Sequence, residues 1–144
     1  MKVLAVDPGG TTGLARWADG DWEAWFEDAQ TAASQVHAEL VAGLDALVFE
    51  SFRISAQTAK KTQTGSLEAI ELIGIGRYLA RQYGTRFVLQ SPAEAKIFAT
   101  DEKLKALGMW TKGVDHPRDA TRHLLLFLAK ERLFDVKKLI PEVI

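Results

Sequence analysis

The stretch Val3-Leu4-Ala5-Val6-Asp7-Pro8-Gly9-Gly10-Thr11-Thr12-Gly13 begins with an apolar run, ends that run on one carboxylate and passes into a glycine-rich turn. Residues 2–6 predict a buried central strand, because the run is continuous in Val, Leu and Ala. Aspartate is disfavoured inside such a strand, and burying a lone carboxylate is costly unless a cation meets it. A metal ion, free or bound to phosphate, is the usual partner where a turn lets substrate approach the backbone. The alternative is that Asp7 only initiates an Asp-Pro-Gly turn.

The rest of the chain alternates strand and helix patterns. Residues 12–17 and 22–26 alternate apolar and polar side chains around Ala18-Asp19-Gly20-Asp21, which is typical of a β-hairpin. Residues 44–49 predict a second buried strand, which also ends on a carboxylate, that of Glu50. The other predicted elements are a helix over 28–42 that ends at Gly43, a long mobile loop over 51–64, a helix over 66–83 that ends at Gly84, a strand over 85–89, a helix from the capping box Ser91-Pro92-Ala93-Glu94, a helix over 101–107 closed by Gly108, and a helix from Asp115 to about Leu133.

This order predicts an α/β fold with a mixed five-stranded sheet, in which an antiparallel meander is followed by parallel strands and helices flank the sheet. We expect one domain over residues 1–144, since the chain is 47% hydrophobic and has no linker. The absence of cysteine excludes disulfides, zinc–thiolate sites and cysteine nucleophiles. No segment has the length of a signal-peptide core or a membrane span. We therefore expect a cytoplasmic protein with no membrane partner.

The charges are distributed unevenly. Residues 1–50 contain two basic and nine acidic side chains, whereas residues 51–144 contain sixteen basic and ten acidic ones. The split indicates that residues 51–144 contain a region that binds anions, although Lys and Arg are also common on solvated helix faces.

Acidic residues follow the two buried strands and begin the last helix. If the two strands are parallel neighbours, Asp7 and Glu50 emerge at one edge of the sheet, where open α/β sheets bind ligands. Asp115, His116 and Asp119 share one face of the last helix, and Arg122 and His123 continue it. Asp115 has the alternative role of helix N-cap, and a lone histidine is more often a surface or core residue than a ligand.

Converging carboxylates repel one another, and Mg²⁺ or Mn²⁺ would relieve that repulsion. Two such ions, roughly 3.5–4 Å apart, activate water and stabilise the leaving oxygen in phosphodiester cleavage. The residue types therefore favour a site for divalent cations, which could hold two ions.

Three motifs resemble those of RuvC-type Holliday junction resolvases, members of the RNase H-like superfamily. Val-Asp-Pro-Gly-Gly-Thr-Thr-Gly-Leu-Ala at 6–15 looks like the first motif, Leu-Val-Phe-Glu-Ser-Phe at 47–52 the second, and Asp-His-Pro-Arg-Asp-Ala-Thr-Arg-His-Leu at 115–124 the last. The order of strands and helices matches too, and the length is closest to the compact resolvases of bacteriophages. The resemblance implies an RNase H-like fold and a protein of a bacterial cell or a phage-infected host.

The resemblance also implies a site and a reaction. Asp7, Glu50 and Asp119 match the three core metal-binding carboxylates, and His116 matches a fourth position that is either Asp or His. Asp115 departs from the pattern; it either caps the helix or reaches a metal in place of His116. The implied activity is resolution of four-way DNA junctions, in which a homodimer makes paired nicks and two-metal hydrolysis leaves 5′-phosphate and 3′-hydroxyl ends.

Several residues outside the motifs are suited to DNA. Cationic, hydroxyl and amide side chains contact phosphates, and an aromatic ring stacks on unpaired bases. Phe52 has the alternative of a core position. The predicted DNA contacts are Phe52, Arg53, Gln57, Lys60, Lys61, Gln63, Lys112 and Arg118. Gly74 and Gly76 lower the helix propensity of 66–83, which places this helix either in the dimer interface or tightly against its own sheet.

Three other functions remain as alternatives. A related nuclease of the same fold would cut flaps, forks, other branched DNA or RNA–DNA hybrids. A catalytically silent DNA-binding module would share the fold without the reaction. An actin-like ATP-binding domain also has Asp-x-Gly-x-Thr after a strand, but it needs two domains and a second phosphate loop, which this sequence lacks.

Overall fold

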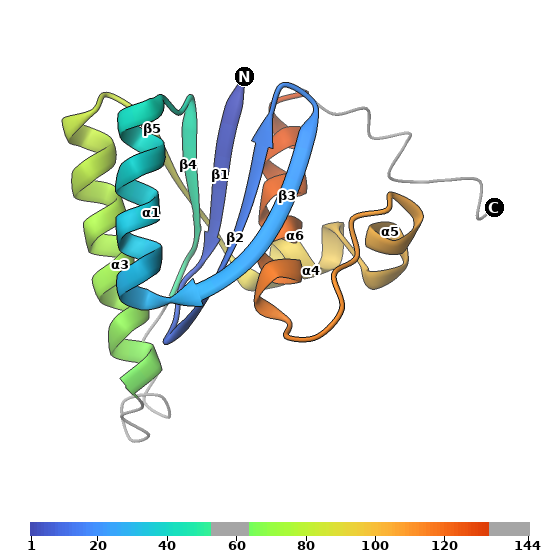
Figure 1. Cartoon of the computed structure of the whole chain (residues 1–144). Coiled ribbons are helices and arrows are strands. Elements are labelled where there is room, and N and C mark those ends of the chain that lie inside the picture. The colour runs from blue at the N-terminus through green and yellow to red at the C-terminus, as the bar shows by residue number, and fades with distance from the viewer. Residues whose placement is uncertain (53–63, 133–144) are drawn as a thin grey trace.

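The computed structural model describes residues 1–52 and 64–132. In these residues five strands form one mixed sheet in the order β3-β2-β1-β4-β5, so the predicted α/β fold is confirmed (Figure 1). The strands are β1 (Lys2–Asp7), β2 (Thr11–Ala18), β3 (Asp21–Asp28), β4 (Ala46–Glu50) and β5 (Arg86–Gln90). The helices are α1 (Ala29–Ala42), α3 (Thr64–Gln82), α4 (Pro92–Phe98), α5 (Asp101–Ala106) and α6 (His116–Lys130).

The register of the sheet brings the ends of distant strands together. Strand β1 pairs antiparallel with β2, and Asp7 lies opposite Gly13. It pairs parallel with β4, with Val6 beside Phe49, and β4 pairs parallel with β5, with Glu50 beside Gln90. The carboxyl ends of β1, β4 and β5 therefore meet at one edge of the sheet.

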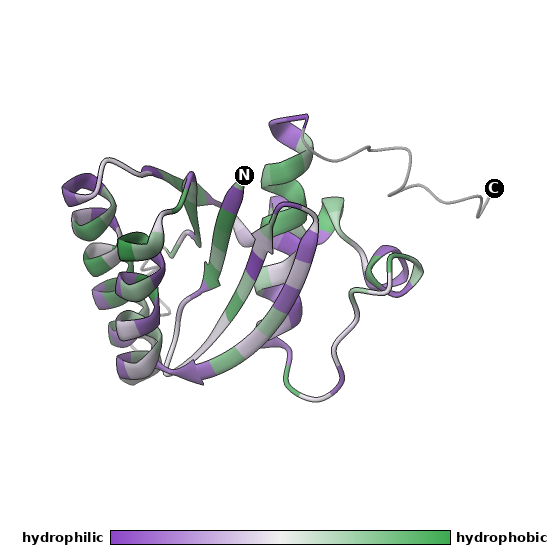
Figure 2. Cartoon of the chain, turned by 45° about the horizontal axis from the view of Figure 1, so that its top comes forward, coloured by the Kyte–Doolittle hydropathy of each residue, from purple (hydrophilic) through white to green (hydrophobic). Residues whose placement is uncertain are grey.

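Helices cover both faces of the sheet, with α1 and α3 on one side and α6 on the other (Figure 1). Successive side chains of a strand point to opposite faces. In β1, Leu4 and Val6 pack with α1 and α3, whereas Val3 and Ala5 pack with α6. This two-sided burial explains the continuous apolar run, and Figure 2 shows β1 and much of α6 coloured as hydrophobic. By the same alternation Asp7 belongs to the face that α6 covers.

The local patterns are borne out at most element ends. Asp19 and Gly20 turn the β2–β3 hairpin with φ of 50° and 100°, as an Asp-Gly turn requires. Ser91 caps α4 by accepting a hydrogen bond from the backbone N–H of Glu94. Helix α3 begins at Thr64 rather than at residue 66, and most of the predicted loop 51–64 lies outside the described residues.

Two glycines allow close packing of helices on the sheet. A Cβ at Gly13 would lie 1.9 Å from the carbonyl oxygen of His116, so only glycine lets the first turn of α6 rest on β2. A Cβ at Gly76 would lie 2.7 Å from the ring of Phe49, so Gly76 serves packing of α3 against its own sheet. Gly74 is exposed, and a Cβ there would meet no atom within 4 Å. In the described part of the chain, no helix combines the length and apolarity needed to cross a bilayer.

Candidate active site at the carboxyl edge of the sheet

Asp7 closes β1 at the centre of the candidate site. The turn that follows is held by Thr12, whose hydroxyl donates to the carbonyl of Gly9 at 2.8 Å. The Asp7 residue is only 6% exposed, and its Oδ2 lies 3.2 Å from Nδ1 of His116, at the start of α6. In this structure the group that lies against this buried acid is therefore an imidazole.

The pKa values of Asp7 and Glu50 move in opposite directions. Burial raises the pKa of Asp7 to about 8; the hydrogen bond with His116 opposes the rise, and Glu50 and Asp119 add to it. Burial alone would raise the pKa of Glu50, but hydrogen bonds with His123 and Asp7 and the charge of Lys96 outweigh it and lower that pKa to about 2. Asp7 is thus the group that holds a proton at neutral pH, and Glu50 is ionised.

Glu50 has a side-chain partner, His123, that the sequence did not reveal as functional, and Gln90 in turn contacts His123. Nε2 of His123 lies 3.5 Å from Oε1 of Glu50, and His123 is only 1% exposed, in the middle of α6. The Nε2 of Gln90 lies 2.9 Å from the carbonyl oxygen of His123 and 3.2 Å from its Nδ1. His123 precedes the apolar run Leu124-Leu125-Leu126, and nothing local marks it as a partner of a carboxylate.

Asp119 lies one turn after His116 on α6 and is held by Arg122. The Nε of Arg122 lies 3.3 Å from Oδ1 of Asp119, and its two terminal nitrogens donate to Asp101 and to the carbonyl of Ala99, each at 2.5 Å. The Asp119 charge raises the pKa values of both Asp7 and His116, so this carboxylate belongs to the same electrostatic cluster. The arrangement brings Asp7, Glu50, His116 and Asp119 together, and their roles as metal ligands stay a prediction.

Asp115 and Arg118 differ from the predictions. Asp115 occupies the N-cap position of α6, but its side chain makes no capping hydrogen bond, so the capping alternative is wrong. Its carboxylate, 77% exposed, instead accepts a hydrogen bond from Arg118. Asp115 also lines the depression that Asp119 lines, and its role as a metal ligand stays a prediction.

Arg118, which we expected to contact DNA, is 8% exposed and points into the protein. It donates to the carbonyls of Thr111 and Gly113 at 2.6 and 3.1 Å, and its guanidinium lies 4.4 Å from the ring centre of Trp110. Because these contacts occupy its donors, Arg118 organises the loop before α6 rather than binding phosphate. Lys112, in the same loop, is exposed and remains available as a predicted DNA contact.

The chemistry of the donor set fits a hard divalent cation. Carboxylate oxygens are the ligands that Mg²⁺ and Mn²⁺ prefer, and Asp7 is a buried acid whose ionisation needs an added positive charge. In residues 1–52 and 64–132, however, no three His, Asp or Glu side chains are arranged to hold an ion. Asp7 and Glu50 hydrogen-bond to each other, and each also has a histidine partner.

A depression of about 400 Å³ lies beside these carboxylates. Its walls include Asp119, Arg122 and the exposed Lys96, whose charge also helps to lower the pKa of Glu50. Lys96 is a site residue that we did not predict, since it lies on a short helix without any motif. A cationic side chain here is placed to meet a phosphate near the carboxylates.

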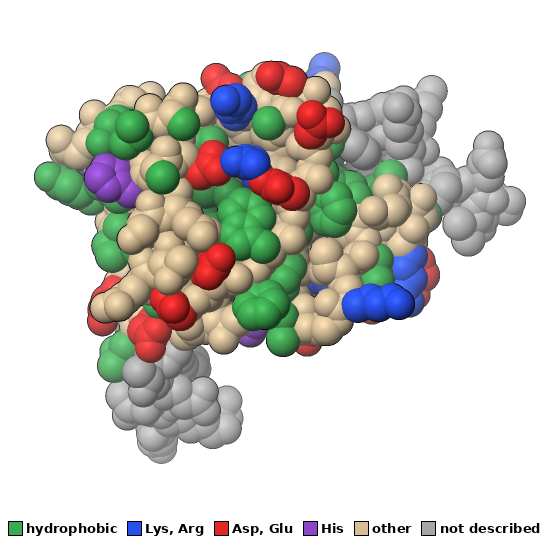
Figure 3. Space-filling model, in the orientation of Figure 1, with side chains coloured by type: hydrophobic (Ala, Val, Ile, Leu, Met, Phe, Trp, Pro, Cys, Tyr) green, Lys and Arg blue, Asp and Glu red, His purple; other side chains and the backbone are tan. Residues whose placement is uncertain are grey.

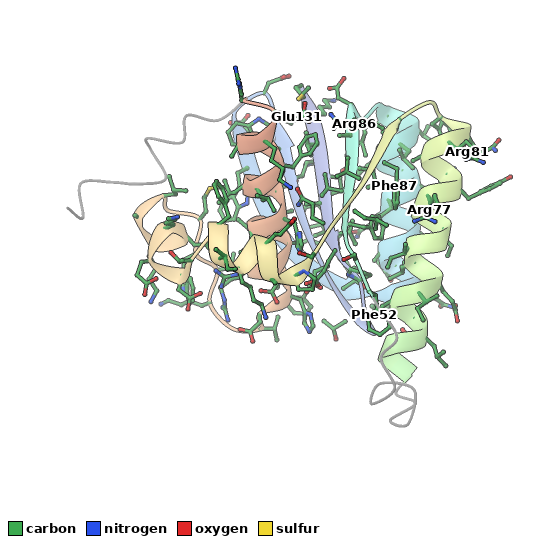
Figure 4. All side chains as sticks on the ribbon, turned by 180° about the vertical axis from the view of Figure 1, so that it is seen from behind. Phe52, Arg77, Arg81, Arg86, Phe87 and Glu131 are labelled. Carbon is green, nitrogen blue, oxygen red and sulfur yellow. The ribbon has the colours of Figure 1, made fainter. Side chains whose placement is uncertain are left out.

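Phe52 is half-buried just beyond β4 and lines a hollow of about 560 Å³ with Ser51, Ser91 and Pro92. Figure 4 shows it at the opposite end of the sheet from Arg86 and Glu131. Phe52 therefore lies at the same edge as Glu50. The other predicted DNA contacts, Arg53, Gln57, Lys60, Lys61 and Gln63, lie outside the described residues.

Charges on the surface follow the uneven distribution in the sequence. Acidic side chains are spread over the face formed by α1, β2 and β3, and the largest basic group in that view lies over α5 (Figure 3). On the opposite face, Arg86 of β5 pairs with Glu131 at 2.7 Å, and Arg77 lies 5.5 Å from the ring centre of Phe87 (Figure 4). Of the basic side chains on α4 and α5, Lys96 lines the depression at the candidate site.

Comparison with known proteins finds structural relatives only. No protein-family model and no curated protein matches the sequence. RuvC of Thermus thermophilus, solved in complex with a Holliday junction substrate, matches with a TM-score of 0.61 and 18% identity over 91% of this chain and 96% of that one. The chain has the fold of RuvC. A second structure of Thermus thermophilus RuvC matches with a TM-score of 0.58 and 18% identity, over 92% of this chain and 97% of the other. The RNase H-like fold expected from the motifs is therefore confirmed.

Proposed function

We propose that this protein is a divalent-metal-dependent endonuclease that resolves four-way DNA junctions. The observation that carries the proposal is the meeting of Asp7, Glu50, His116 and Asp119, from three distant segments, at one edge of a sheet with the fold of RuvC. Carboxyl groups that lie close together in a partly buried position disfavour one another's ionised forms, and bound cations stabilise those forms. The structure solved with a Holliday junction substrate supports the choice of substrate.

Asp7, Glu50 and Asp119, with His116 as the fourth group, would hold two Mg²⁺ or Mn²⁺ ions. Bound ions would activate a water for in-line attack on the phosphodiester and neutralise charge on the leaving 3′ oxygen, giving 5′-phosphate and 3′-hydroxyl ends. The protein itself would contribute three things. Asp7 would release its proton when an ion binds, Arg122 would hold Asp119, and Lys96 would meet a phosphate.

We further propose that a homodimer makes paired nicks, with α3 in the interface. Four large apolar side chains of α3 are between 38% and 62% exposed: Leu67, Ile70, Ile75 and Tyr78. Exposed apolar residues along one helix favour a partner surface. Analytical ultracentrifugation of the wild type and of Ile75→Glu tests this point: a dimer that the substitution dissociates supports it, and a monomeric wild type contradicts it.

The experiment for the main proposal compares substrates. Purified protein with Mg²⁺ or Mn²⁺ is incubated with end-labelled four-way junction, fork, flap and duplex DNA. We expect symmetric nicks confined to the junction. Cleavage of flaps or forks with the junction spared would favour the related-nuclease alternative, and tight binding without cleavage in any divalent ion would favour a silent DNA-binding module.

A further inference from the structure

The carboxamide of Gln90 and the ring of His123 are buried together beneath Glu50. Gln90 is 3% exposed and His123 1% exposed, and Gln90 is the neighbour of Glu50 across β4 and β5. Water is therefore excluded from their contacts. The neighbours of each group therefore determine which of its atoms donate a hydrogen bond and which accept one.

The orientation of the Gln90 carboxamide is determined by a backbone carbonyl. Its Nε2 lies 2.9 Å from the oxygen of His123, and only the amide N–H₂, not the amide oxygen, can pair with a carbonyl. The same Nε2 lies 3.2 Å from Nδ1 of His123. An N–H₂ group has two protons to donate and cannot accept, so Nδ1 must be the unprotonated, accepting nitrogen of the ring.

With Nδ1 as an acceptor, the ring proton of His123 is on Nε2. That nitrogen faces Oε1 of Glu50 at 3.5 Å, the outer limit of a hydrogen bond. We propose that Gln90 and His123 are positioning residues: Gln90 selects the Nε2–H tautomer of His123, which donates to Oε1 of Glu50 and orients this carboxylate toward metal. The inference rests on the proposed function for the metal, but the tautomer can be measured without it.

This chain differs from the usual outer-shell arrangement in one respect. In that arrangement a carboxylate or carbonyl orients a histidine that binds the metal, and loss of such a partner costs about 10–100-fold in metal affinity. Here the order is reversed, because a histidine orients the carboxylate. Metal affinity should therefore depend on the N–H group that donates to Glu50, and not on the aromatic ring that carries this group.

Three variants separate positioning from packing. His123→Gln keeps an N–H donor near the position of Nε2, His123→Leu removes the donor and keeps the volume, and Gln90→Leu removes the group that selects the tautomer. We expect isothermal titration with Mn²⁺ to show about a 10–100-fold weaker affinity for His123→Leu and Gln90→Leu, with most of the affinity restored in His123→Gln. Circular dichroism establishes that each variant is folded.

A second measurement does not depend on metal binding. Long-range ¹H–¹⁵N correlation spectra of the metal-free wild type report which ring nitrogen of His123 carries the proton. A protonated Nε2 with an unprotonated Nδ1 is expected, and Gln90→Leu should disturb this pattern. A proton on Nδ1, or on both nitrogens, would overturn the inference, as would unchanged Mn²⁺ affinity in folded His123→Leu. Failure of the wild type to bind Mn²⁺ or cleave DNA, with the Nε2–H tautomer present, would instead contradict the proposed function.

Discussion

Nδ1 of His116 lies 3.2 Å from Oδ2 of Asp7, although 109 positions separate the two residues in the chain. The contact joins the last residue of β1 to the first residue of α6, and the bare backbone of Gly13 makes the approach possible. Each carboxylate at this edge has a basic partner in the same way: His123 for Glu50 and Arg122 for Asp119. In the described structure each acid that we propose to bind metal therefore lies against a basic side chain.

Asp7→Asn should lower cleavage of a four-way junction by at least about a hundredfold and leave binding of the junction largely intact. Asparagine keeps the volume but removes the anionic ligand, whereas phosphate contacts elsewhere dominate affinity for DNA. Gel-based cleavage and fluorescence anisotropy measure the two effects. Asp21→Asn, at an exposed acid far from the site, is the matched control. Cleavage by Asp7→Asn at near the wild-type rate would refute the metal assignment.

The metal-free protein should lose stability as pH rises from about 5 to 8. The pKa of Asp7 is about 8 in the folded state against 3.8 ordinarily, so over this interval the folded state binds more protons than the unfolded state, and stability falls with pH. The raised pKa of His116 acts with the same sign, whereas Glu50, with a pKa lowered to about 2, stays ionised throughout.

The slope of the unfolding free energy should approach about 1.4 kcal/mol per pH unit for one proton. Thermal denaturation in EDTA at several pH values measures it, and Asp7→Asn should flatten it. Added Mn²⁺ should restore stability at pH 8, because the ion replaces the proton on Asp7. A melting temperature that rises steadily from pH 5 to 8 in EDTA would contradict the raised pKa.

Gly13→Ala should destabilise the fold and weaken the site. The new Cβ would lie 1.9 Å from the carbonyl oxygen of His116, so α6 must move away from β2. Overpacking of this kind costs about 1–3 kcal/mol. Urea denaturation measures the loss, and titration with Mn²⁺ should show weaker binding because His116 leaves Asp7. Unchanged stability would show that α6 does not rest on β2.

The two glycines of α3 should respond in opposite ways to alanine. Gly76→Ala places a Cβ 2.7 Å from the ring of Phe49 and should destabilise by about 1–3 kcal/mol. Gly74→Ala meets no neighbour within 4 Å and should stabilise by up to about 1 kcal/mol through helix propensity, unless a dimer partner approaches there. Denaturation of both variants, at low and high protein concentration, distinguishes these effects. Equal changes in the stability of the two variants would contradict the packing of Gly76 against Phe49.

Arg122→Met should destabilise the protein by about 1–3 kcal/mol and reduce cleavage by about 10–100-fold. The guanidinium bridges Asp119, Asp101 and the carbonyl of Ala99, and removing it leaves these acceptors without that donor. Arg122→Lys should recover little of the lost stability or cleavage, since one ammonium group cannot reproduce the planar set of donors of a guanidinium. Arg86→Ala is the control: its ion pair with Glu131 is more than half exposed on the arginine side and should contribute less than about 1 kcal/mol. Wild-type cleavage by folded Arg122→Met would show that Asp119 needs no such support.

The sequence predicted the site best where a strand ends on an acid. The apolar runs before Asp7 and Glu50 indicate buried strands, and parallel pairing of such strands predicts that both acids emerge at one edge of the sheet, as the structure confirms. Arg118 shows the limit of this reasoning. Its sequence position beside the last motif suggested a DNA contact, yet its side chain is buried among the carbonyls of its own loop. A sequence position does not reveal which way a long side chain turns.

By itself the sequence determined the order of strands and helices, the acids at their ends and the hairpin turns, because these depend on periodicity and on preferences of residues close in the chain. Only the tertiary structure decided which basic side chain faces each acid. The pairing of Glu50 with His123 depends on the register of β4 beside β1 and on the seating of α6 against Gly13. Such partners are selected by packing between elements that meet only in the folded chain, and no local pattern encodes them.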